Sequence, residues 1–187
     1  MRQYAVILAD PPWSYNDEGR RYSAARQYPT MTDANIQALP VASMAAPDCV
    51  LLMWATWPKL AEACLPTIKA WGFDYVTAFP WVKITQVSRD LWGELHIQVP
   101  YGVGFWARGT SEPLLIARRG NPKPPPNGFI GLLSPNLSHS RKPESVYEYA
   151  EALPGPYLEL FARRKRAGWD SWGNQVQSDV VMATNGE

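Results

Sequence analysis

The sequence predicts an α/β domain built on a parallel sheet, and three observations support this fold class. Apolar runs at 49–55 and 75–82 have the length and composition of buried strands. Between them, residues 59–71 carry apolar side chains at helical spacing. This strand, helix, strand order favours a parallel sheet with right-handed crossovers. A length of 187 residues fits one domain with a sizeable core.

The other segments extend the same pattern. A strand at 4–8 is stopped by two prolines, and Thr32 can cap a short helix that ends at Leu39. Four prolines make 121–128 a loop. Further elements are expected as strands at 113–117, 129–133 and 157–162, a helix at 144–153 and a turn with a strand end at 169–175. We assign 1–176 to the domain and 177–187 to a polar, frayed tail.

The stretch Asp10-Pro11-Pro12-Trp13 follows the first strand directly. An acidic residue therefore stands at the carboxyl end of a strand, followed by a rigid turn and an aromatic side chain that we expect to be exposed. In open α/β sheets this edge binds ligands. Residues 14–30 are polar and rich in Gly, Arg and Tyr, so we expect them to form a mobile lid.

This stretch suits chemistry on the exocyclic amine of a nucleobase. The nitrogen lone pair is delocalised into the ring, and acceptors at both N–H bonds favour the pyramidal, nucleophilic form. The Asp10 carboxylate and the Pro11 carbonyl are such acceptors, and Trp13 can stack on a base that has left its duplex. A structural Asp-Pro turn with a packed tryptophan is the alternative.

Composition limits the other classes of function. Cys49 and Cys64 lie in apolar stretches without metal-ligand spacing, so we expect reduced, buried thiols and no metal site. His96 is expected to be a surface histidine. The sequence has neither a long apolar span nor a signal peptide, which predicts a cytoplasmic protein that does not enter membranes.

Positive charge is concentrated late in the chain. Although the net charge is +1, residues 107–166 carry ten of the 18 Lys and Arg but five of the 17 Asp and Glu. This segment faces phosphate or is a solvated surface. Residues 83–104 show little periodicity and contain Trp92 and Tyr101. We expect a long functional loop there, with 84–104 as a candidate homodimer interface.

The residues resemble the MT-A70 family of adenine N6-methyltransferases. The resemblance runs from Tyr4 to Val176 and depends on an ordered set of short segments rather than on four residues. In chain order these are Asp10-Pro11-Pro12-Trp13, Trp54, Trp71-Gly72-Phe73, Trp81-Val82-Lys83, Glu112, Gly120-Asn121-Pro122, Lys142-Pro143-Glu144, Tyr147, Glu159-Leu160-Phe161-Ala162-Arg163 and Trp172-Gly173-Asn174-Gln175.

The resemblance implies a Rossmann-like S-adenosylmethionine-dependent methyltransferase sheet in permuted order, with the catalytic strand before the cofactor strand. Asp10-Pro11-Pro12-Trp13 would be catalytic, and Asp10 would lie near both the target amine and the methionine part of the cofactor. The implied cofactor contacts are Phe161 and Arg163 for the adenosine, Asn174 and Gln175 for the ribose, and Ser140, Lys142 and Pro143 for the shape of the pocket.

The chain is most similar to the compact bacterial and phage branch of the family, which implies DNA as substrate and a bacterial or phage-infected cell as location. RNA methylation and a catalytically silent nucleic-acid-binding subunit are the alternatives. Ser111 departs from family members in which a lysine precedes the glutamate matching Glu112. The candidate nucleic-acid contacts are Arg108, Arg118, Arg119, Lys123, Arg164, Lys165 and Arg166.

Overall fold

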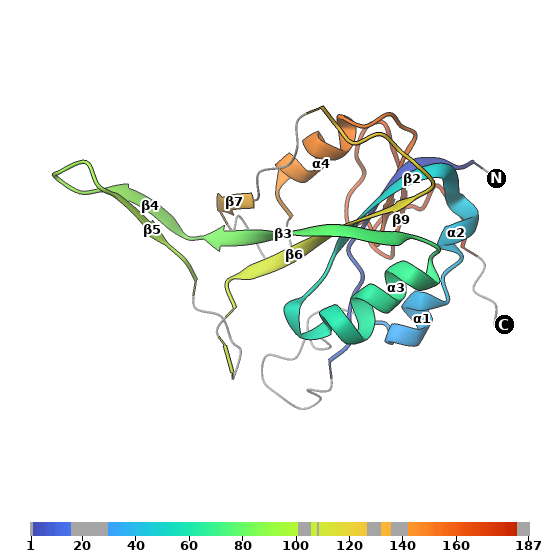
Figure 1. Cartoon of the computed structure of the whole chain (residues 1–187), viewed down its shortest axis with the longest axis horizontal. Coiled ribbons are helices and arrows are strands. Elements are labelled where there is room, and N and C mark those ends of the chain that lie inside the picture. The colour runs from blue at the N-terminus through green and yellow to red at the C-terminus, as the bar shows by residue number, and fades with distance from the viewer. Residues whose placement is uncertain are drawn as a thin grey trace.

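A computed structural model describes residues 2–15, 30–100, 106–107, 109–126, 132–135 and 142–182, with the backbone alone for 132–135. Its centre is a seven-stranded sheet in the order β7-β3-β6-β2-β1-β8-β9 (Figure 1). The strands are β1 Tyr4–Ala9, β2 Ala45–Trp54, β3 Asp74–Ile84, β6 Ser111–Arg119, β7 Leu132–Pro135, β8 Tyr157–Leu160 and β9 Trp169–Trp172.

The mixed α/β fold class is confirmed, with one antiparallel strand inside a mostly parallel sheet. β1 pairs in parallel with β2 and β8, β8 with β9, and β3 with β7. β6 lies between β2 and β3 and runs antiparallel to both. The expected crossover from β2 to β3 therefore skips one sheet position, because the chain returns after β3 and inserts β6 into the gap.

Helices cover both faces of this sheet (Figure 1). They are α1 Asp33–Gln37, α2 Val41–Met44, α3 Leu65–Ala70 and α4 Glu144–Glu151. Side chains alternate along β1, so Ile7 joins the core on the α1 and α3 face, whereas Val6 and Leu8 join the core on the α4 face. Both faces are buried, which explains why the strands read as continuous apolar runs.

The segment predicted as one bent helix at 59–71 is divided. A 3₁₀ turn at Trp57–Lys59 leads into a π-helical turn at Leu60–Cys64, and then into α3. The irregular turns lie directly before Pro66, which cannot donate a backbone hydrogen bond. The expected cap at Thr32 is present, since its hydroxyl accepts a hydrogen bond from the Asn35 amide.

Much of the segment expected as a long loop at 83–104 is regular. β3 continues to Ile84, and a hairpin of β4 Gln86–Arg89 and β5 Leu95–Gln98 then projects from the body (Figure 1). Asp90 shapes the hairpin turn by accepting from the amides of Trp92 and Glu94. His96 is an exposed residue next to Asp90, as expected.

Two further findings concern the chain termini and membranes. Of the predicted polar tail, Val180 and Met182 pack against the core, and the Asp179 amide donates to the Ser171 carbonyl at 2.8 Å. Residues 183–187 lie outside the described part. Among the helices of the described segments, none has the length and apolar character needed to cross a membrane.

A proline-rich strap at 122–125 follows β6 and is anchored at Gly120 and Asn121. Gly120 has φ +68°, and a Cβ at this position would lie 2.3 Å from the Pro47 carbonyl oxygen. The Asn121 amide donates to Asp48 Oδ1 at 2.7 Å. This anchor therefore requires a residue without a side chain.

We predict that Gly120→Ala lowers the free energy of unfolding by about 2 kcal/mol, because both the left-handed backbone and the close carbonyl disfavour Cβ. Urea unfolding monitored by tryptophan fluorescence measures this change. Gly109→Ala is the matched control, since a Cβ at Gly109 meets no atom within 4 Å. Equal losses in the two variants would contradict the prediction.

Candidate active site

Asp10 lies at the carboxyl end of β1, where the structure brings the two ends of the chain together. β1 pairs with β8 so that Ala9 opposes Leu160, and the Asp10 amide donates to the Leu160 carbonyl at 3.4 Å. A cavity of about 260 Å³ opens beside this contact. Its walls come from residues far apart in sequence, namely Asp10, Pro12, Thr30, Met31, Phe161, Arg163, Trp172, Gly173, Asn174 and Gln175.

The wall of this cavity opposite Asp10 includes Phe161, whose backbone conformation is unusual. Phe161 has φ +62°, which is rare for a residue with a side chain, and this conformation turns the chain out of β8. The Ala162 amide then donates to the Trp172 carbonyl at 2.9 Å. A Cβ on Gly173 would lie 2.3 Å from the Ala162 carbonyl oxygen, so glycine is required there. Strained backbone of this kind is concentrated at ligand-binding sites.

Four charged side chains form a cluster next to the cavity. Lys142 Nζ lies 3.3 Å from Asp10 Oδ1 and 2.6 Å from Glu112 Oε2. Lys83 Nζ contacts the other Glu112 oxygen. The Lys142 side chain is 16% exposed and that of Glu112 is 23% exposed, so the contacts are only weakly screened by solvent. Two cations and two anions thus balance each other within the cluster.

The electrostatics of the cluster favour the charged forms. Burial opposes the charge of Glu112, but Lys142 and Lys83 outweigh it and hold the Glu112 pKa below its usual range. Burial likewise opposes the charge of Lys142, but Asp10 and Glu112 raise its pKa. At neutral pH, Lys142 therefore acts as a fixed ammonium group that orients Asp10.

Two tryptophan rings form cation–π contacts with the two lysines of the cluster. Lys142 Nζ lies 4.8 Å from the centroid of Trp54, and Lys83 Nζ lies 4.9 Å from that of Trp81. The two indoles meet edge to face at 5.6 Å. The Trp54 indole N–H is buried and has no acceptor among the described residues. Such a donor fits a polar ligand or a water molecule at this position.

A further carboxylate, Glu159, lies on β8 next to the active edge. Tyr147 donates a hydrogen bond to it at 2.9 Å. Burial raises the pKa of Glu159, and the charge of Asp10 acts in the same direction. The carboxyl edge of the sheet therefore carries two acidic groups in different environments, with Asp10 paired with Lys142 and Glu159 accepting a hydrogen bond from Tyr147.

The expectation for Trp13 was wrong. Its side chain is 4% exposed and belongs to the core, and its indole N–H donates to the Trp54 carbonyl at 3.3 Å. A buried ring cannot stack on an incoming base, so Trp13 stabilises the turn instead. The Pro11 carbonyl accepts from the Trp13 amide at 2.9 Å. This contact leaves one lone pair of the carbonyl for another donor.

The predicted site residues are partly brought together. Asp10, Phe161, Arg163, Asn174 and Gln175 line one cavity. Two others have different places: Lys142 binds Asp10 and Glu112 instead of lining that cavity, and Pro143 is buried as the N-cap of α4. Ser140, Arg108 and residues 16–29 of the expected lid lie outside the described segments.

The predicted phosphate contacts are divided between two regions. Arg118 and Arg119 are the last two residues of antiparallel β6, and Lys123 follows them, so all three lie at the opposite sheet edge from Asp10. Along β6, Arg118 is about 20 Å from Glu112. Arg119 donates to the Ala42 carbonyl at 2.5 Å. A nucleotide held at Asp10 does not reach this group directly.

The second group follows β8 and is already paired. Arg164 lies 3.0 Å from Glu144, Arg166 binds Glu144 and Glu151, and Lys165 binds Asp179. These ion pairs fasten α4 and the tail to the turn after β8. The Arg164 and Lys165 side chains remain 45% and 44% exposed, so they are still accessible to solvent.

Sequence reasoning did not assign roles to Glu112, Lys83, Trp54, Trp81 and Glu159. Each is a charged or bulky aromatic side chain within or beside an apolar strand, where charge is costly unless it is paired. That pattern indicates buried polar contacts. Their pairing, however, depends on which strands are neighbours, and β6 lies between β2 and β3 only in the folded chain.

The sheet and the cavity at its carboxyl edge, with a strand-end carboxylate, define a Rossmann-like methyltransferase. Comparison with known proteins specifies the family, because residues 4–175 match the MT-A70 family model. This chain belongs to the MT-A70 family of adenine N6-methyltransferases.

Three relatives illustrate the range of the family. The type II methyltransferase M.MunI of a Mycoplasma species is 31% identical over all of this chain and 84% of its own length. The human N(6)-adenine-specific methyltransferase METTL4 is 30% identical over 94% of this chain. The N6-methyladenosine RNA methyltransferase MTA1 of Cryphonectria parasitica is 31% identical over 92% of it. The chain spans only 38% and 52% of these last two proteins.

We predict that Lys142→Met lowers the free energy of unfolding at neutral pH by about 1–2 kcal/mol, because Asp10 and Glu112 lose a shared cation. In the wild type, the depressed Glu112 pKa contributes stability above the unfolded pKa, and this contribution is lost as the pH falls through the folded pKa. In the variant the Glu112 pKa is lowered less, so the free energy of unfolding falls less between about pH 6 and about pH 3.

Chemical denaturation at several pH values measures both effects. Lys69→Met is the matched control, because Lys69 and Asp74 form an ion pair whose side chains are 81% and 79% exposed. Its loss should cost less than about 0.5 kcal/mol. An unchanged pH dependence in Lys142→Met would rule out the assigned role of this cation.

Proposed function

We propose that this protein uses S-adenosylmethionine to methylate the exocyclic amine of adenine in DNA. The observation that carries the proposal is the position of Asp10, which lines the cavity shared with Phe161, Arg163, Asn174 and Gln175 and is held by Lys142. A carboxylate in the wall of this cavity can accept hydrogen bonds from both the target amine and the ammonium group of the methyl donor. Family membership in adenine N6-methyltransferases supports the same chemistry.

The residues of the cavity fit the methyl donor. Carboxylate oxygen at Asp10 suits the donor's ammonium group, and the Phe161 ring offers an apolar face for its adenine. Asn174 and Gln175 are exposed at the rim, where amide groups can bond the ribose hydroxyls. Because Gly173 has no side chain, its backbone packs directly against that of Ala162 in this part of the wall.

The reaction needs little beyond positioning. S-adenosylmethionine supplies an electrophilic methyl carbon on sulfur. The Asp10 carboxylate and the free lone pair of the Pro11 carbonyl each accept a hydrogen bond from one N–H group of the amine. These hydrogen bonds make the amine nitrogen more nucleophilic. The nitrogen then forms a bond to the methyl carbon as the carbon–sulfur bond breaks. The surplus proton leaves to Asp10 or to water.

DNA is favoured over RNA by the similarity to M.MunI, whose length this chain nearly spans. RNA is the alternative, and the similarity to the fungal MTA1 supports it. In either case the base must be single-stranded or turned out of the duplex to reach Asp10. Arg164 and Lys165 are the candidate phosphate contacts that remain exposed near α4.

We predict that Asp10→Ala abolishes methyl transfer, with a loss of at least about a thousandfold, while the protein remains folded. Transfer of a labelled methyl group from S-adenosylmethionine to adenine-containing DNA and RNA oligonucleotides measures activity, with circular dichroism as the test of folding. Asp74→Asn is the matched control, because the Asp74 side chain is 79% exposed at the opposite sheet edge.

The outcomes of this assay separate the alternatives. Normal transfer by Asp10→Ala would refute the catalytic assignment. Transfer to RNA but not DNA would establish the alternative substrate. A wild-type protein that neither methylates nor shows a thermal shift with S-adenosylmethionine would be a silent subunit.

We further propose that two copies associate through the β4–β5 hairpin. The hairpin extends from the carboxyl end of β3 and projects from the body of the molecule (Figure 1). Several of its large apolar side chains are exposed to solvent. Leu91 is 97% exposed and Trp92 is 85% exposed at its tip. Exposed apolar surface of this kind is typical of protein interfaces. A second copy would stand beside the active edge.

We predict that Leu91→Glu with Trp92→Glu converts a dimer into a monomer, because charges at the tip must lose their hydration on association. Size-exclusion chromatography with light scattering measures the mass across a dilution series. Val181→Glu is the control, since Val181 is an 84% exposed apolar residue far along the chain. A wild-type protein that is monomeric at high concentration would refute the interface.

A further inference from the structure

A second hollow lies on the sheet face that carries α4. Its volume is about 400 Å³, within the range of roughly 300–1,000 Å³ for small-molecule pockets. Val50, Phe79 and Ile116 form an apolar floor from three neighbouring strands, and Tyr149 of α4 forms one wall. The strap at 122–125 forms the opposite wall. The helix α4 has eight residues, and the strap covers a neighbouring part of the same sheet face.

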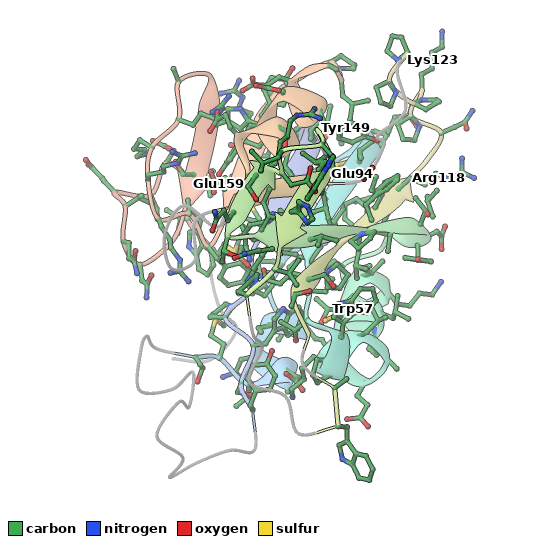
Figure 2. All side chains as sticks on the ribbon, turned by 90° about the vertical axis from the view of Figure 1, so that its left-hand side faces the viewer. Trp57, Glu94, Arg118, Lys123, Tyr149 and Glu159 are labelled. Carbon is green, nitrogen blue, oxygen red and sulfur yellow. The ribbon has the colours of Figure 1, made fainter. Side chains whose placement is uncertain are left out.

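Two cations stand at the rim of this hollow. Arg118 and Lys123 are both exposed lining residues, and neither forms an ion pair with another described residue. This distinguishes them from Arg164, Lys165 and Arg166, which are all paired. Figure 2 shows Arg118, Lys123 and Tyr149 around one corner of the molecule, well separated from Trp57, which follows the carboxyl end of β2.

The rigidity of the strap makes the hollow a formed site. Gly120 and Asn121 are fixed against Pro47 and Asp48, as described above, and the prolines of the strap have restricted backbone angles. Burial of Tyr149 raises the pKa of its hydroxyl, so this group stays neutral at physiological pH. The walls are mainly hydrocarbon and aromatic, and the positive charge lies at the mouth alone.

We propose that this hollow binds a small amphiphilic anion. Its apolar body would lie on Val50, Phe79 and Ile116, and its carboxylate, sulfonate or phosphate would lie between Arg118 and Lys123. The floor offers few polar atoms to hydrogen-bond the edge of a nucleobase, which disfavours a nucleotide. The site is at the opposite sheet edge from Asp10, so it is independent of the proposed methyltransferase function.

The test uses 1-anilinonaphthalene-8-sulfonate, an aromatic sulfonate that fluoresces in apolar surroundings. We expect saturable binding with one site per folded chain, competition by octanoate and much weaker competition by octanol. The double variant Arg118→Ala with Lys123→Ala should bind the probe about five- to tenfold more weakly, and added salt should reduce wild-type binding. Arg89→Ala, on the hairpin, is the control and should bind normally.

Each other outcome overturns the proposal. Wild-type affinity in the double variant, non-saturable binding or equal competition by octanol would show that the rim cations do not recognise an anion. A loss of duplex DNA binding by the double variant with unchanged probe binding would assign the cations to nucleic acid instead. Lys123→Glu alone keeps the test valid if the double variant does not fold, because Lys123 is exposed on the strap. This charge reversal must weaken binding of the probe.

Discussion

The parallel pairing of β1 with β8 is the constraint on which the candidate active site depends. It sets Ala9 opposite Leu160, so the acidic turn at residue 10 and the segment 161–163 leave the sheet side by side. Two regions about 150 residues apart in sequence thus form the walls of one cavity. The positive φ of Phe161 and the missing side chain of Gly173 then bring the second wall close enough to complete it.

Charge balance decides how Asp10 is held within this frame. The Asp10 carboxylate is paired with the Lys142 ammonium group, which it shares with Glu112. Lys83 completes the balance, and the faces of Trp54 and Trp81 lie against the two ammonium groups. The cluster costs desolvation energy, which a purely structural site would avoid by using apolar residues. Its presence beside the cavity supports a functional role.

Much of the architecture could be predicted from the sequence, because buried strands and helix caps are local patterns. The strand that presents Asp10, the cap at Thr32 and α4 were all anticipated. The hairpin at 86–98 was not, because its two strands have only four residues each and nearly all of their side chains are exposed, so neither forms the apolar run of a buried strand. The exposure of Trp13 was also misjudged, since an aromatic after a turn can point into the core or away from it.

The sequence by itself determined most of the elements, the family and several of the residues that line the cavity, since these depend on local propensity and on an ordered set of short segments. Only the tertiary structure decided which charges meet. Insertion of antiparallel β6 between β2 and β3 places Glu112 within reach of Lys83 and Lys142, and the same reversal carries Arg118 to the opposite sheet edge. Strand direction fixes the end of the sheet at which a side chain lies, and that direction results from long-range pairing that no local pattern encodes.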